Sequence, residues 1–149
     1  MSTDLKRRNV PFSPPDMTEA EANEVRDTIL SGWITTGPRT KKLEKLISEY
    51  VGTEKTVCLN SATAAMEMVL HVLGVGSGDE VIMPAYTYTA SASVVDHVGA
   101  TIKMVDIRKA GSSDEDQDFE MDYEKLAEAI TERTKVVVPV DLAGICANV

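Results

Sequence analysis

Two short polar segments have the residue types of a site for a phosphorylated ligand that carries a flat ring. The first is NSATAAM at 60–66, which follows the apolar run at 56–59 and opens a helical pattern. A helix that starts after a strand leaves backbone N–H groups unpaired at its first turn, where the helix dipole favours an anion. Because Ser61 and Thr63 add hydroxyl donors, the segment predicts an anion site. Simple capping of the helix is the alternative.

The second segment is PAYTYTAS at 84–91, which also lies between an apolar run, at 81–83, and a helical pattern. Ligands of open α/β sheets collect at the carboxyl ends of the strands, so we expect the two segments to line one pocket. Tyr86 or Tyr88 would then lie flat against a heteroaromatic ring. The alternative is that both tyrosines are half-buried packing residues.

Other kinds of site lack their sequence patterns. The chain has no glycine-rich dinucleotide fingerprint after a strand, no P-loop and no GxSxG elbow. Cys58 and Cys146 stand far apart with no CxxC motif, so we interpret them as buried or incidental thiols and not as zinc ligands. His71 and His97 fall in helical patterns flanked by apolar residues, which is typical of structural histidines.

Charge and composition disfavour two classes of partner. Fifteen basic and 24 acidic residues give a formal net charge of −9, which disfavours binding to nucleic acid. No apolar run approaches the roughly 20 residues that span a bilayer, and no apolar region of a secretory signal follows the basic N-terminal residues. We therefore expect a cytoplasmic protein that binds neither nucleic acid nor membrane. A chain of 149 residues with 43% hydrophobic residues is long enough to bury a core.

The periodicity of apolar residues predicts the elements that position the two polar segments. A capping box of Thr18 and Glu21 begins the first helical pattern. Pro38 begins the second, whose apolar stripe should lie on a core and which Gly52 should end. Short apolar runs then alternate with helical patterns, which predicts βαβ units. The expected helices are 18–31, 38–51, 62–73, 89–98 and 122–131, and the expected strands are 56–59, 81–83, 102–105 and 136–140.

The expected fold is therefore α/β, with a mainly parallel sheet flanked by helices on both faces. We predict that 1–52 forms an N-terminal helical arm and that 53–149 forms a βαβ core. The acidic segment GSSDEDQDFEMD at 111–122 lacks the ligand pattern of a calcium loop. We expect it to be a solvated loop that leads into a helix capped by Asp122.

The order of the motifs resembles that of the DegT-type family of sugar aminotransferases, which are fold-type I enzymes dependent on pyridoxal 5'-phosphate (PLP). The resemblance runs from about Val10 to the last residue and covers only the first part of the family's length. It implies part of the PLP-binding large domain of a fold-type I transferase. The segments that carry it are WITTGP, NSATAAM, GDEVIMPAYTYTASA, VDI at 105–107 and ITERTKVVVPVDLAG at 130–144.

The resemblance also implies a function and site residues. The function would be transfer of an amino group to a keto nucleotide-sugar, with glutamate as the usual donor, in polysaccharide or sugar biosynthesis by a homodimer. Asp141 departs from the family, because many relatives have His at that place. The residues assigned to PLP are Ser61, Ala62, Thr63 and Tyr88, and those assigned to the nucleotide-sugar are Trp33, Thr35, Thr36 and Tyr86.

The family's Schiff-base lysine, and the aspartate that pairs with the pyridine nitrogen, come later than the segment that ends here at Val149. We therefore interpret the chain as an N-terminal piece that is inactive alone, with no catalytic residue of its own. Truncation would leave the expected strand at 56–59 without its neighbours, which predicts self-association. A PLP-dependent sugar dehydratase of the same family, a non-catalytic fragment or remnant, and a generic nucleotide-binding module stay open as alternatives.

Overall fold

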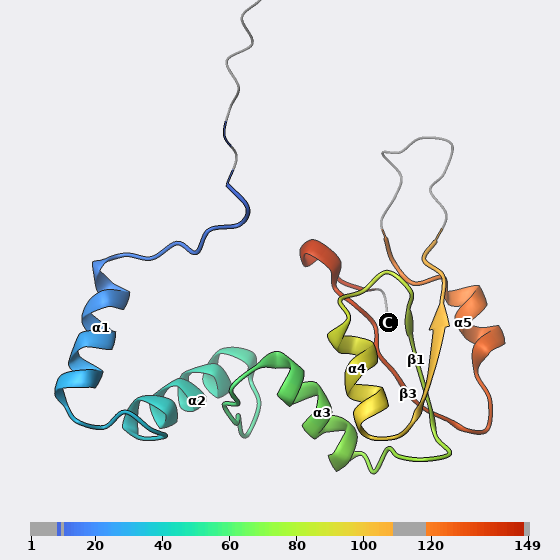
Figure 1. The fold of residues 1–149 in the computed structure, drawn as a ribbon, viewed down its shortest axis with the longest axis horizontal. Helices are drawn as coiled ribbons and strands as arrows, with labels where there is room; N and C mark the ends of the chain where they lie inside the picture. Colours follow the sequence, from blue (N-terminus) through green and yellow to red (C-terminus); the bar gives the residue numbers. More distant parts are fainter. Residues whose placement is uncertain (1–8, 10, 109–118, 148–149) are drawn as a thin grey trace, which may run out of the picture. The chain divides into compact units, whose positions relative to one another are not determined.

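The computed structural model describes residue 9 and residues 11–108 and 119–147. The chain divides into two compact units, Met1–Cys58 and Leu59–Val149. The elements of both units are labelled in Figure 1.

The first unit contains helices α1 (Glu19–Leu30) and α2 (Pro38–Val51). The predicted capping box is present, because the Thr18 hydroxyl accepts from Ala20 N at 3.2 Å and the Glu21 carboxylate accepts from Thr18 N at 2.6 Å. Gly52 ends α2 with a φ of +74°, a conformation that glycine adopts at little cost.

The apolar stripe of α2 does not lie on a core as expected. Each of its large side chains is at least 40% exposed, and in the described part of the unit neither helix has a buried residue. Helical periodicity reports which side chains share a face, but it does not report what covers that face. The exposed members of the stripe are Leu43, Leu46, Ile47, Tyr50 and Val51.

The second unit is a parallel sheet with helices, as the alternating pattern predicts. Its strands lie in the order β2-β1-β3, and β1 pairs in parallel with both neighbours. The elements in chain order are α3 (Ala62–Val72), β1 (Glu80–Pro84), α4 (Ala90–His97), β2 (Thr101–Val105), α5 (Tyr123–Ala129), β3 (Thr134–Val137) and the short 3-10 helix Leu142–Gly144.

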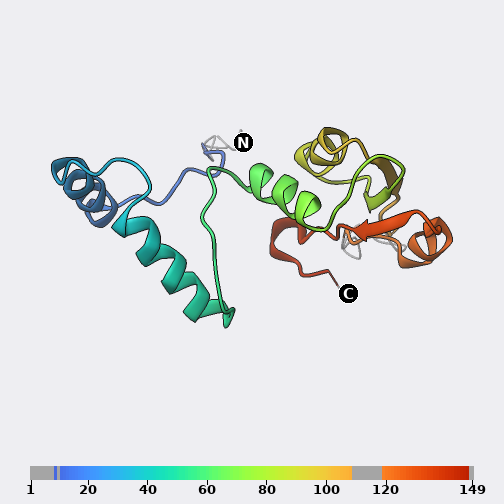
Figure 2. The ribbon, with the colours of Figure 1, turned by 90° about the horizontal axis from the view of Figure 1, so that it is seen from below.

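Helices cover both faces of this sheet, so every residue of β1 is buried. On one face, Val81 and Met83 pack in a cluster with residues of α3 and α4, and α4 lies above β3 in Figure 2. On the other face, Ile82 packs with Val105 and Met121, and α5 covers this second cluster. The alternation of one strand between two apolar clusters explains why its sequence is apolar at successive positions.

The strand expected at 136–140 and the helix expected at 122–131 both end earlier than predicted. The expected strand at 136–140 ends as β3 at Val137, although Val138 N still donates to Ile82 O at 2.8 Å. Pro139 follows and has no N–H to continue the ladder. Helix α5 begins after Asp122, whose carboxylate accepts from Glu124 N and Lys125 N as the predicted cap. Most of the acidic segment, 109–118, lies outside the described residues.

The expected strand at 56–59 does not form. Among the described residues it pairs with no other strand, and side chains of α2 hold it instead. The Glu44 carboxylate accepts from Cys58 N at 3.0 Å, and the hydroxyls of Ser48 and Thr56 lie 2.8 Å apart. A strand needs a neighbour for its backbone groups, and β propensity alone does not supply one. The edge from which we expected self-association is therefore missing at this segment.

Candidate functional site

The N-terminus of α3 has the geometry of an anion site. Ser61 is the N-cap in extended conformation, and its hydroxyl oxygen accepts from Ala64 N at 3.1 Å. Ala65 N donates to Ser61 O, whereas the amides of Ala62 and Thr63 have no acceptor among the residues that the structure describes. Two N–H groups and the Ser61 hydroxyl proton thus remain available to an anion. Ser61 also caps the helix, so the anion site and the helix cap do not exclude each other.

The turn between β1 and α4 is held at both ends by hydrogen bonds. Ala85 N donates to Val105 O at 2.7 Å, which ties the start of the turn to the end of β2. The hydroxyls of Thr87 and buried Ser91 lie 2.9 Å apart at its other end. In Figure 1 the N-terminal end of α4 lies at the end of the sheet toward which the β2 arrow points. The turn therefore stands at the carboxyl edge of the strands, as expected.

The two tyrosines of this turn differ in their surroundings. Tyr88 is 80% exposed, so its ring is not a packing residue in this structure. Tyr86 is 53% exposed and stacks on Phe119, with ring centroids 5.3 Å apart and an interplanar angle of 26°. Sequence reasoning missed Phe119 because we treated it as part of the acidic segment, in which it is the single aromatic residue.

The predicted cofactor residues belong to one unit, but Tyr88 and the start of α3 come from different elements of it. Helices α3 and α4 pack together through Leu70 and Val94, in the later turns of α3. Among the described residues, no hydrogen bond or ring contact connects Tyr88 with Ser61 or Thr63. That Ser61, Ala62, Thr63 and Tyr88 hold one ligand stays a prediction.

The residues predicted to border the nucleotide-sugar form a loop of the first unit. Trp33 Nε1 donates to Thr36 O at 3.0 Å, and the indole lies directly against Gly37. A Cβ atom at Gly37 would lie only 2.1 Å from Nε1, so the loop requires glycine there. The cavity at this loop measures about 450 Å³. Trp33 and Thr35 line it, together with Arg39, which pairs with Glu24.

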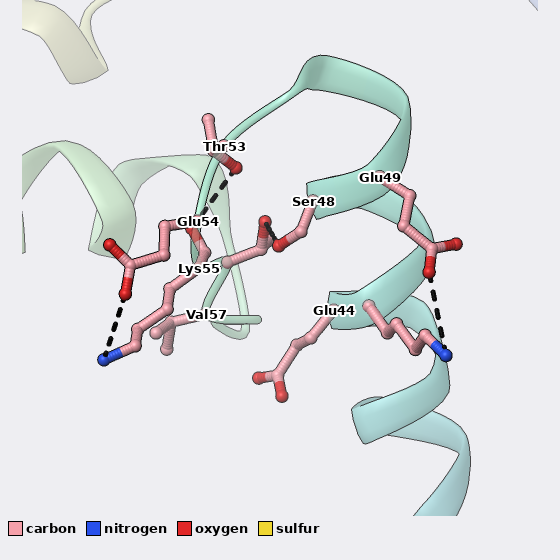
Figure 3. A pocket seen from close by; sticks show the side chains of 9 residues that line it. Glu44, Ser48, Glu49, Thr53, Glu54, Lys55 and Val57 are labelled. Carbon is pink, nitrogen blue, oxygen red and sulfur yellow. Dashed lines mark hydrogen bonds and ion pairs between the residues drawn. The ribbon is translucent and has the colours of Figure 1, made fainter.

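A second hollow of the first unit, of about 480 Å³, lies between α2 and the segment 53–57, and Figure 3 shows its side chains. Its charged groups are engaged with one another or with the backbone. Lys45 pairs with Glu49 at 3.6 Å and Lys55 with Glu54 at 3.9 Å. Glu44 accepts from the backbone of Cys58. None of the predicted site residues lines this hollow.

A buried carboxylate fixes the opposite edge of the sheet. Glu80, the first residue of β1, is 3% exposed and accepts from Thr131 Oγ1 at 2.7 Å. Arg133 and Lys103 donate to the same carboxylate, at 2.5 and 3.4 Å. The Thr131 hydrogen bond, aided by these two positive charges, lowers the pKa of Glu80 against the opposing effect of burial. These groups join β1 to β2 and to the residues just before β3, at the end of β1 opposite to the candidate site.

The remaining titratable groups offer no metal site in the described part of the chain. No cluster of three or more His, Cys, Asp or Glu side chains occurs there. Cys58 and Cys146 are free thiols, half-buried and exposed respectively. His97 Nδ1 lies 2.9 Å from the Glu67 carboxylate and so links α4 to α3, which fits a structural histidine. In the same described residues, no helix has both the length and the apolar character needed to cross a membrane.

Comparisons with known proteins agree on one family. The DegT/DnrJ/EryC1/StrS aminotransferase family matches residues 15–149. The PLP form of the putative sugar aminotransferase Spr1654 from Streptococcus pneumoniae is 62% identical, with a TM-score of 0.85 over 95% of this chain and 34% of that one.

Two curated relatives show the same partial coverage. The UDP-4-amino-4-deoxy-L-arabinose–oxoglutarate aminotransferase of Shewanella sediminis is 40% identical over 91% of this chain and 33% of its own length. The spore coat polysaccharide biosynthesis protein SpsC of Bacillus subtilis is 37% identical over 94% of this chain and 35% of its own. The chain thus spans about a third of the length of the relatives it matches.

Proposed function

The chain belongs to the DegT/DnrJ/EryC1/StrS aminotransferase family. We propose that it supplies cofactor- and substrate-binding residues of a PLP-dependent aminotransferase that acts on a keto nucleotide-sugar with glutamate as amino donor. One similarity supports the substrate class and another supports the cofactor. One relative is named for a UDP-linked amino sugar and oxoglutarate, and a closely similar structure is a PLP form. The observation that carries the proposal is the pair of open amides, Ala62 N and Thr63 N, at the start of α3.

The residues of α3 fit the phosphate end of PLP. A phosphate carries negative charge and several acceptor oxygens, and the first turn of α3 offers two N–H donors at the positive end of the helix dipole. The Ser61 hydroxyl can donate while its oxygen still accepts from Ala64 N. Thr63 supplies a second hydroxyl. These groups bind and orient the cofactor, and none of them takes part in bond making.

In this proposal the Tyr88 ring stacks on the pyridine ring of the cofactor. Its side chain is 80% exposed at the carboxyl edge of the sheet, so a flat ligand can cover it without displacing a protein group. When bound, PLP supplies the electron sink for amino-group transfer. Trp33, Thr35 and Thr36 bind the nucleotide-sugar, and Tyr86 borders it. Each of these residues binds or orients a ligand, and none is proposed to take part in bond making.

The experiment is a calorimetric titration with pyridoxamine 5'-phosphate (PMP), compared with pyridoxamine, which lacks the phosphate. PMP has no aldehyde, so it reports the binding seat without an imine to any lysine. We expect PMP to bind and pyridoxamine to bind at least about tenfold more weakly, because hydrogen bonds to a charged group contribute about 1.5–3 kcal/mol each. Equal affinity for the two ligands would contradict the phosphate seat.

A second titration tests the substrate class. UDP-glucose should bind to the protein, and Trp33→Ala should weaken that binding while PMP affinity stays unchanged. Binding of UDP-glucose by a protein that ignores PMP would instead support the generic nucleotide-binding module. A protein that binds neither ligand would contradict the proposal and favour a non-catalytic fragment.

A further inference from the structure

We propose that Phe119 is a positioning residue of the nucleotide-sugar site, where its ring holds the ring of Tyr86 at the carboxyl edge of β1. The inference rests on the proposed function, in which Tyr86 borders the nucleotide-sugar. Phe119 itself touches Tyr86 and acts on the ligand only through it. Neither the motifs nor the family resemblance assigned any role to Phe119.

The contact between the two rings is specific in its geometry. Their centroids lie 5.3 Å apart and their planes are inclined by 26°, which is within the range of favourable aromatic pairs. Tyr86 nevertheless remains 53% exposed and Phe119 38% exposed. The stack therefore fixes Tyr86 on one side and leaves much of its surface open to a ligand.

The backbone that carries Phe119 is anchored immediately after it. Met121 is 3% exposed in the cluster with Ile82 and Val105, and it forms an antiparallel bridge with Ile107. Arg108 N donates to the carbonyl of Glu120 at 2.8 Å. These contacts hold the residues directly following Phe119, so its ring extends from an anchored backbone.

The backbone of Tyr86 is anchored to the same base. Ala85 N donates to Val105 O at 2.7 Å, and Val105 belongs to the buried cluster that holds Met121. The two rings thus extend from neighbouring backbone segments that share one core. Removing either ring would leave the backbone in place but would free the other ring to change rotamer, and a ligand would then have to order that ring on binding.

The conformation of Phe119 is a second and independent observation. Its φ is +56°, which is rare and unfavourable for a bulky side chain. Such strain persists only when surrounding contacts enforce it, and it concentrates at functional sites. Among the described residues, the stack on Tyr86 and the anchors at Glu120 and Met121 are the contacts that hold the ring and backbone at this position.

The test is the affinity of the protein for UDP-glucose, measured by calorimetry in four variants: Phe119→Leu, Phe119→Tyr, Tyr86→Leu and the double variant Tyr86→Leu/Phe119→Leu. We expect Phe119→Leu to weaken binding about threefold to tenfold, the range that corresponds to one aromatic pair. Phe119→Tyr, which keeps a ring, should restore the affinity. Leucine keeps apolar volume at the position, so the fold has no reason to fail.

The double variant separates positioning from a general structural effect. If Phe119 acts through Tyr86, Phe119→Leu causes no further loss when Tyr86 is already leucine. A loss of the same size in both backgrounds, or wild-type affinity in Phe119→Leu, would overturn the inference and leave the proposed function standing. Absence of UDP-glucose binding by the wild-type protein would overturn both. PMP affinity should be the same in all four variants, and its loss would reveal a wider structural change that contradicts the positioning role.

Discussion

Gly37 decides where the Trp33 indole lies, and Gly37→Ala is the perturbation that tests this most sharply. The added Cβ atom would lie 2.1 Å from Nε1 and 2.2 Å from Cδ1 of Trp33. The backbone conformation at Gly37 is allowed for alanine, because a φ of −160° is extended. The main effect of the substitution is therefore a steric displacement of the indole.

The size of the displacement follows from the contact distance. Non-bonded heavy atoms settle at about 3.5 Å or more, so the indole must withdraw by roughly 1.4 Å. The hydrogen bond from Nε1 to Thr36 O, now 3.0 Å long, cannot survive a shift of that size. We expect a loss of about 0.5–1.5 kcal/mol, the net contribution of a neutral hydrogen bond, confined to this loop.

The assay is the fluorescence of Trp33, which is the single tryptophan of the chain. Gly37→Ala should shift its emission and make it more accessible to acrylamide quenching. Gly52→Ala is the matched control in the same unit, because a Cβ there meets nothing within 4 Å although its φ of +74° is unfavourable for alanine. The control should lower stability by about 1–2 kcal/mol and leave the emission unchanged. Wild-type emission and quenching in Gly37→Ala would refute the placement of the indole.

Three further substitutions test other parts of the structure. Thr63→Val keeps the shape of the side chain but removes its hydroxyl. It should weaken PMP binding about tenfold in calorimetry while pyridoxamine affinity stays the same. Wild-type PMP affinity in this variant would show that the Thr63 hydroxyl does not bind the phosphate. Glu80 has a lowered pKa in the folded protein, so its contribution to stability is complete above the unfolded value of about 4.3 and is lost as pH falls through the folded pKa. Urea unfolding should therefore show wild-type stability falling in that acidic range, with a flatter profile and lower stability at pH 7 for Glu80→Gln; parallel profiles would contradict the role of this carboxylate. Asp122→Ala removes the cap of α5 and should cost about 1 kcal/mol of unfolding free energy, whereas Asp96→Ala, at an exposed position of α4, should cost much less.

Features set by near neighbours in the sequence could be predicted. The capping box of Thr18 and Glu21, the glycine end of α2 and the Asp122 cap all involve residues within a few positions of one another. The strand β1 was also predicted, because a strand buried on both faces is apolar at successive positions. Strands β2 and β3 were predicted from their short apolar runs, although most of their residues are only partly buried or exposed.

Features set by distant partners could not be predicted. The segment 56–59 has strand-like residues, but whether it forms a strand depends on a neighbour that its own sequence does not contain. Tyr86 and Phe119 meet across 33 positions of the chain, and no local pattern reports that contact. Glu80 likewise finds Thr131 and Arg133 only because β1 and β3 are neighbours in the sheet.

The central claim is that α3 and the turn before α4 hold two ends of one cofactor molecule. Nuclear magnetic resonance of the PMP complex tests it directly, because both ends are observed in one sample. The account predicts shifts of the Ala62 and Thr63 amides together with nuclear Overhauser contacts between the pyridine protons and the Tyr88 ring. Amide shifts without contacts to Tyr88, or contacts to Tyr88 without amide shifts, would contradict it.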